Sequence, residues 1–297
     1  ADPSGKFLYT ANFGDGSVTS YGITQSGSGI GSLTSTGNVP SGSGAIDIAV
    51  LPSGNFAYVT NFTSQQIITF SINPTTGALT KVGTTTPIPF IGAPQGVAAH
   101  PNGNFIYVTG SVTNNVAGEG LNPTSGVPNG FVPGSPITAG SDPESVALDP
   151  LGNQLFTVNA LSNNVSTFTV DPGTGALSFV ENVPTAPALA FPINIAVDPR
   201  STYAYVVGSN LSTGSIESFA IEGGTLVPSV TSVAAGGDPR SVVVDPSGKF
   251  VYVAAQPLGS TPGGVLAYSI TAPGVLTPIA FSSPPLHATS ITVIAVP

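Results

Sequence analysis

Two charged residues stand at matching positions of the sequence and could do chemistry together. Glu144 and Arg240 each follow an Asp-Pro pair and each precede a serine. A carboxylate can activate water as a general base, and a guanidinium can stabilise the oxyanion that forms when water attacks a carbonyl carbon. The pair could therefore hydrolyse an ester-like bond, and Asp47 is a second candidate carboxylate.

A simpler interpretation stays open, in which Glu144 and Arg240 pair with each other or face solvent. When the first strands of the repeated segments are aligned, the two positions at the start of each strand form two successive rings. Glu144 and Arg240 share the first ring with isoleucines and Gln95, and the second ring holds Asp47, Asn194 and Ser241. We predict binding roles for the polar members Asp47, Gln95, Asn194 and Ser241.

Several other kinds of site are not expected. The chain has no cysteine and two histidines. His100 stands in a turn motif, and His287 precedes the last apolar run, so no zinc ligand set can be assembled. No Asp-x-Asp-x-Asp run suggests calcium, and the glycine-rich stretches lack the helix and lysine of a phosphate loop. We therefore expect no metal and no cofactor.

The charge balance limits the partners. Asp and Glu total 14 and Lys and Arg total five, which gives a net charge of −9. Five scattered cations cannot neutralise a run of phosphates, so nucleic acid is excluded as a partner, and so is an anionic membrane surface. No apolar run is long enough to cross a bilayer. The scarcity of protease-sensitive Lys and Arg favours an extracellular or cell-surface location.

The elements that position these residues come from an internal repeat. The segment Asp2-Pro-Ser-Gly-Lys-Phe-Leu-Tyr recurs in five further copies, spaced 49, 49, 49, 49 and 47 residues apart. The copies begin near residues 2, 51, 100, 149, 198 and 245. We expect one domain over residues 1–297.

Each copy contains four short runs of strand character. In the second copy these are residues 45–50, 55–60, 66–72 and 77–83, rich in β-branched and aromatic residues. Asp-Pro-Ser-Gly is a type I turn sequence, and no window has helical periodicity. Four antiparallel strands repeated around an axis predict an all-β, six-bladed β-propeller.

The chain ends favour this architecture over a solenoid, which would need polar caps. The sequence begins in the middle of a repeat, and residues 289–296 read as the missing first strand. We therefore predict that the C-terminal strand pairs with the N-terminal blade and closes the ring, which leaves no open sheet edge.

The repeats also resemble known families. Phe56-Ala-Tyr-Val-Thr-Asn61 resembles the Tyr-Val-Thr-Asn repeat of bacterial and archaeal surface propellers. Residues 237–253 resemble the lactonase-like propellers, which include 6-phosphogluconolactonase and muconate cyclases. That resemblance implies seven blades, and lactone chemistry by Arg, His and Glu at one mouth of the channel. Here Pro239-Arg240 is followed by Ser241 where the family has His.

Two functions are compatible with these features. The preferred prediction is a non-catalytic extracellular or cell-surface propeller that binds an unidentified ligand or protein, or associates with itself. Its basis is the low charge and the absence of the family's histidine. The alternative is a lactonase-like hydrolase or isomerase acting on a small lactone, with Glu144 as base and Arg240 as oxyanion clamp.

Overall fold

The computed structural model describes residues 1–87, 91–228, 232–272, 274–282 and 289–293. The chain divides into two compact units. Unit 1 comprises residues 1–138, 171–177 and 294–297, and unit 2 comprises residues 139–170 and 178–293. The two units are described separately below.

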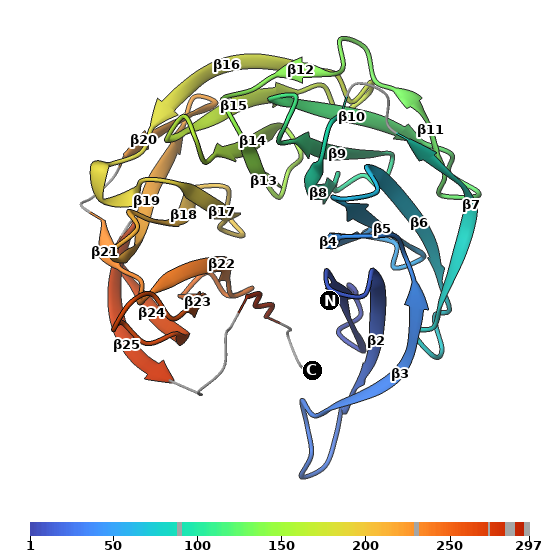
Figure 1. The fold of residues 1–297 in the computed structure, drawn as a ribbon, viewed down its shortest axis with the longest axis horizontal. Coiled ribbons are helices and arrows are strands. Elements are labelled where there is room, and N and C mark those ends of the chain that lie inside the picture. The colour runs from blue at the N-terminus through green and yellow to red at the C-terminus, as the bar shows by residue number, and fades with distance from the viewer. Residues whose placement is uncertain (88–90, 229–231, 273, 283–288, 294–297) are drawn as a thin grey trace. The chain divides into compact units, whose positions relative to one another are not determined.

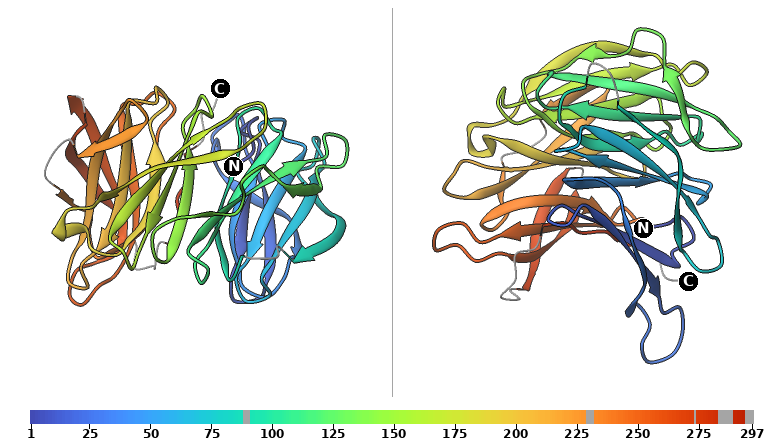
Figure 2. Two further views of the ribbon diagram at one scale, coloured as in Figure 1. Left: turned by 90° about the horizontal axis from the view of Figure 1, so that it is seen from above. Right: turned by 45° about the vertical axis from the view of Figure 1, so that its right-hand side comes forward.

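The described residues of unit 1 form three antiparallel sheets (Figures 1 and 2). Their strands are β1 (Phe7–Asn12), β2 (Ser17–Ile23) and β3 (Leu33–Pro40); β4 (Ala45–Val50), β5 (Phe56–Asn61), β6 (Gln66–Ile72) and β7 (Leu79–Pro87); and β8 (Pro94–Ala99), β9 (Phe105–Gly110), β10 (Asn115–Leu121), β11 (Pro128–Phe131) and β12 (Ile137–Thr138).

The described residues of unit 2 also form three antiparallel sheets. Their strands are β13 (Pro143–Leu148), β14 (Gln154–Asn159), β15 (Asn164–Val170) and β16 (Leu177–Pro184); β17 (Pro192–Val197), β18 (Tyr203–Ser209), β19 (Gly214–Glu222), β20 (Thr225–Pro228) and β21 (Val233–Ala234); and β22 (Asp238–Val244), β23 (Phe250–Gln256), β24 (Gly264–Ala272) and β25 (Val275–Ser282). A three-residue 3-10 turn, Pro187–Leu189, precedes β17.

These sheets confirm the predicted all-β fold and the strands of the repeat. In the second copy, β4 and β6 have the predicted bounds, β5 lies one residue later than predicted, and β7 begins two residues and ends four residues later. The Asp-Pro-x-Gly turns close as their chemistry requires. In the last copy, the Asp245 carboxylate accepts the N–H groups of Ser247 and Phe250, at 3.0 and 2.7 Å. This side chain thus replaces ladder bonds that the turn itself cannot make.

The predicted pairing of a C-terminal strand with the first sheet is not seen in the described residues. The first sheet contains β1, β2 and β3, and residues 289–293 form no strand. The remainder of the predicted closing strand, 294–296, lies outside the described residues, as does His287. Within the described part of the chain, no helix has the length and hydropathy of a membrane span.

Apolar clusters between neighbouring sheets hold each unit together. In unit 1, Phe70 and Ile68 of β6 pack with Phe7 and Val18 of the first sheet. In unit 2, Phe219 of β19 packs with residues of β14 and β15. Strand side chains alternate between the two faces of a sheet, so each sheet contributes one face to each neighbouring cluster.

A close contact between an aromatic ring and a glycine also recurs in unit 1. Gly126 has a φ of +69°, and a Cβ there would lie 2.4 Å from the ring of Phe56. The Tyr58 hydroxyl donates to the Gly126 carbonyl oxygen at 2.6 Å. Gly77 meets Phe7 in the same way. The turn between the third and fourth strands of a sheet is therefore fastened to the sheet before it, and only glycine fits there.

Candidate functional site

Each first strand of unit 2 begins with a β-bulge, and the bulged residues include both candidate catalytic groups. The β13–β14 register shifts between Pro143 and Ser145, so Glu144 has no partner on β14. The equivalent shifts leave Ile193 unpaired at the start of β17 and Arg240 unpaired at the start of β22. A bulge turns a side chain out of the ladder and is frequent beside active sites.

The first strands lie side by side in unit 2, which brings the bulges to one end of neighbouring strands. β17 lies against both β13 and β22. We use "bulge site" for Asp142, Glu144, Ile193, Asp238 and Arg240. The sequence placed Glu144 and Arg240 in one ring but gave no sign of the bulges, except that a proline precedes each bulged residue and cannot donate to the ladder.

Glu144 has the electrostatic environment of a general base. Its side chain is half-buried. The pKa of Glu144 is raised to about 7, mainly by burial and secondly by the negative charge of Asp142, while Arg240 acts in the opposite direction. Burial also raises the pKa of Asp142, which has a φ of +59° directly before Pro143. A carboxyl group with a pKa near neutrality can both accept and return a proton at physiological pH.

Arg240 keeps part of its guanidinium accessible. It forms an ion pair with Asp238, and the two side chains are 41% and 13% exposed. A guanidinium has five N–H donors, so a single carboxylate partner does not exhaust it. The positive charge of Arg240 lowers the pKa of Glu144, so the two groups interact electrostatically.

Asn194 ties together the strands that carry these groups. Its Oδ1 accepts the Val242 N–H of β22 at 3.0 Å, and its Nδ2 donates to the Ser145 hydroxyl of β13 at 3.1 Å. Ser241, also predicted to bind ligand, is buried, and its hydroxyl accepts the Ile291 N–H at 3.4 Å. Both side chains hold neighbouring segments in place, a role that sequence reasoning missed.

Asp47 and Gln95 belong to unit 1. The Asp47 carboxylate accepts the Val97 N–H from β8 at 2.9 Å, as Asn194 does for Val242. Burial raises the pKa of Asp47, and its two backbone hydrogen bonds act in the opposite direction. The Gln95 carbonyl oxygen accepts the Thr60 hydroxyl at 2.6 Å.

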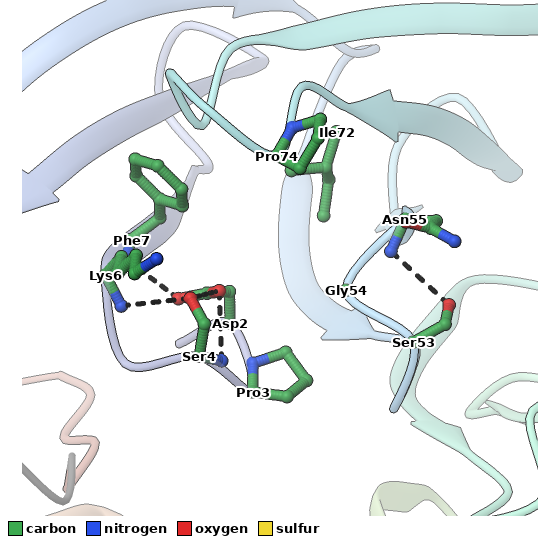
Figure 3. Close-up of a pocket in the computed structure, with 10 residues that line it drawn as sticks. All are labelled: Asp2, Pro3, Ser4, Lys6, Phe7, Ser53, Gly54, Asn55, Ile72 and Pro74. Carbon is green, nitrogen blue, oxygen red and sulfur yellow. Dashed lines mark hydrogen bonds between the residues drawn. The ribbon is translucent and has the colours of Figure 1, made fainter.

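Unit 1 has an open hollow of about 400 Å³ at the opposite end of its strands, beside the Asp-Pro-x-Gly turns (Figure 3). Figure 3 shows Asp2, Ser4 and Lys6 facing Ser53 and Asn55 across it. The Asp2 carboxylate accepts hydrogen bonds from the Ser4 and Phe7 N–H groups of its own turn. Its charged group is therefore committed to turn structure.

Two buried glutamates lie on the third strands of their sheets, outside the bulge site. Glu217 of β19 accepts the Ala186 N–H at 2.9 Å, and burial raises its pKa. Glu119 of β10 is 7% exposed, and burial raises its pKa to about 7. Among the residues that the structure describes, no group of three or more His, Asp or Glu side chains could hold a metal ion.

Comparison with known proteins points to one family. The family model described as "Lactonase, 7-bladed beta-propeller" matches residues 1–191 and 185–261. The Pseudomonas aeruginosa periplasmic gluconolactonase superposes with a TM-score of 0.79 at 19% identity, covering 98% of this chain and 86% of its own. A candidate 6-phosphogluconolactonase from Bacteroides uniformis gives 0.78 at 21% identity, covering 93% and 81%. No curated protein sequence matches significantly.

These similarities contradict the preferred functional prediction. The chain resembles lactonases and not a non-catalytic surface propeller for binding or assembly, so that prediction was wrong and the alternative is favoured. The error came from the weight given to Ser241, which stands where the family has His. The pKa of Glu144 is raised to about 7, which makes its carboxyl group an alternative candidate for a base.

Proposed function

Because this chain belongs to the lactonase family of β-propellers, we propose that it hydrolyses the ring ester of a small lactone at the bulge site. The observation that carries the proposal is the half-buried Glu144, with a pKa of about 7, beside the cationic Arg240. A base with a pKa near the working pH transfers protons most effectively.

The reaction follows from these two groups. The ionised Glu144 accepts a proton from a water molecule, whose oxygen attacks the lactone carbonyl carbon. The carbonyl electron pair moves to oxygen, and Arg240 donates hydrogen bonds to this oxyanion. When the intermediate collapses, the bond between the carbonyl carbon and the ring oxygen breaks, and the ring oxygen takes the proton from Glu144. The product is an open-chain hydroxy acid, which releases a proton as it ionises.

Four neighbouring side chains support this machinery. Asn194 links the strand of Glu144 to the strand of Arg240. Asp238 fixes the guanidinium, and Asp142 raises the pKa of Glu144. Ser241 and Asn194 contribute as positioning residues in this proposal, whereas binding roles for Asp47 and Gln95 stay predictions.

The proposal is tested by pH-stat hydrolysis of a panel of γ- and δ-lactones. We expect E144Q and R240A each to lower kcat by about 100-fold, the usual contribution of a general base or an oxyanion donor. E222Q and R200A remove exposed charges elsewhere in unit 2 and are the matched controls. Turnover by E144Q at the wild-type rate would remove Glu144 from the mechanism.

We also propose that the six sheets are the six blades of one propeller, closed by residues 289–296. One observation supports this. The first sheet lacks the short first strand that the other five sheets possess as β4, β8, β13, β17 and β22. Small-angle X-ray scattering would distinguish a closed disc from an open assembly.

A further inference from the structure

Two turns that border the bulge site carry exposed leucines. Leu161, in the β14–β15 turn, is 64% exposed, and Leu211, in the β18–β19 turn, is 74% exposed. In unit 1 the same turn carries Phe13, which is 54% exposed, and Val112, which is 72% exposed. Single exposed apolar residues are ordinary, but an apolar residue at the same turn of successive repeats is a pattern that solvation does not favour.

Hydrogen bonds fix the turn of Leu161 to the loops that lead into the bulges. Its N–H donates to the Ser141 carbonyl oxygen at 3.2 Å, and the Ala160 N–H donates to the Asp142 carbonyl oxygen at 2.8 Å. On its other side, the Asn163 side chain accepts the Phe191 N–H at 2.9 Å. Leu161 therefore stands between the loops that precede Glu144 and Ile193.

The turn of Leu211 lies between the next pair of loops. Gly208, before the turn, pairs with Pro192. Gly214, after the turn, donates its N–H to the Gly236 carbonyl oxygen at 3.0 Å, two residues before Asp238. Leu211 thus stands between the loops that precede Ile193 and Arg240. With the partly buried Phe191 and Ile193, the two leucines provide apolar surface on the side of the bulge site.

The charges of the bulge site do not suit an anionic substrate. Asp142, Glu144 and Asp238 are acidic, and Arg240 is already paired with Asp238. The other Lys and Arg residues of unit 2 are Arg200 and Lys249, both in Asp-Pro turns at the opposite end of the first strands. A phosphate dianion would meet an excess of negative charge with no second cation to hold it.

We propose that the bulge site takes an uncharged lactone with an aliphatic substituent, which packs on Leu161 and Leu211, and that it discriminates against phosphorylated sugar lactones. This inference rests on the proposed function and narrows its substrate class. Asp142 is the residue that determines the charge preference, and the two leucines determine the preference for the alkyl chain.

The test compares kcat/KM for δ-decalactone, δ-gluconolactone and 6-phospho-δ-gluconolactone. We expect δ-decalactone to be the best substrate, and the phosphorylated lactone to be at least about tenfold worse than its neutral parent. The double variant L161S/L211S should lower the ratio of kcat/KM for δ-decalactone to that for δ-gluconolactone by about tenfold, as the loss of buried methylene contacts requires. D142N should raise kcat/KM for the phosphorylated lactone relative to δ-gluconolactone.

L151S is the matched control, because Leu151 is 69% exposed but lies in an Asp-Pro turn at the far end of β13. It should keep the wild-type ratio. Equal or faster turnover of the phosphorylated lactone, or a ratio that L161S/L211S leaves unchanged, would overturn the inference.

Calorimetric binding of the δ-lactam with the same pentyl chain separates this inference from the chemistry. If L161S/L211S weakens binding of the lactam, the apolar subsite is supported. This result would hold even if E144Q hydrolysed lactones like the wild type and the proposed mechanism failed. If the lactam does not bind and no lactone is preferred, the inference is refuted.

Discussion

Glu119 occupies a position where the other repeats have an aromatic residue. The equivalent third-strand residues of the other copies are Tyr21, Phe70, Phe168, Phe219 and Tyr268. Each of them stands two positions before an isoleucine or a valine. Glu119 lies opposite Ile106 on β9 and opposite Phe131 on β11, and both belong to one apolar cluster. The carboxyl group therefore enters the core between two sheets of unit 1.

The pKa of Glu119 predicts how this group affects stability. Burial raises the pKa from 4.5 to about 7, and a hydrogen bond from the Gly130 backbone acts in the opposite direction. Because the folded protein holds the proton more tightly than the unfolded chain, the stabilisation is complete below about pH 4.5 and is lost as the pH rises to about 7. At about 1.4 kcal/mol per pH unit, the total loss is about 3 kcal/mol.

The substitution E119Q removes this titration and keeps the shape of the side chain. Urea unfolding at pH 4, 5, 6, 7 and 8 should show the wild type losing about 3 kcal/mol relative to E119Q across the series. E222Q, which removes an exposed carboxylate of β19, controls for the change in net charge. If the wild-type and E119Q stabilities ran parallel from pH 4 to pH 8, the buried carboxyl group would not be the cause and the reasoning would fail.

Further predictions concern the bulge site and the contact between sheets. The kcat/KM for lactones should rise with pH through about 7 as Glu144 ionises. In a pH–rate profile, the inflection should lie higher in R240A and lower in D142N, because Arg240 lowers the pKa of Glu144 and Asp142 raises it. N194A should lower kcat about tenfold, with the fold retained by circular dichroism, because β13 and β22 lose their common partner. G126A should cost about 2 kcal/mol or more in urea unfolding, since its Cβ would lie 2.4 Å from the Phe56 ring. G103A, at φ +76° with open space around it, should cost less.

Much of the fold could be predicted because each copy of the repeat contains a similar turn sequence. Asp-Pro-Ser-Gly and its variants mark where the first strand of each copy ends, and the alternation of apolar residues sets the strands that follow. The sheets confirm this. Closure of the ring, the extracellular location and self-association stay predictions, because none of them is decided by the described residues.

The candidate site was only partly predictable, for two physical reasons. Alignment of the copies brought Glu144 and Arg240 to equivalent positions, but a bulge changes the pairing of a strand without changing the spacing of its motif. The pKa of Glu144 depends on burial and on charges from separate parts of the chain. Sequence reasoning therefore overvalued the absence of a histidine.

The bulge also allows the residue that faces the site to change without loss of the fold. The bulged residue has no directly opposite partner on the next strand, and Ile46, Glu144, Ile193 and Arg240 all occupy such a position. Isoleucine, glutamate and arginine thus stand at equivalent positions of the repeat, so side chains of very different size and charge are compatible with the bulge. A library that randomises these positions alone should retain folded members at high frequency, so that new specificities could be selected without first restoring stability.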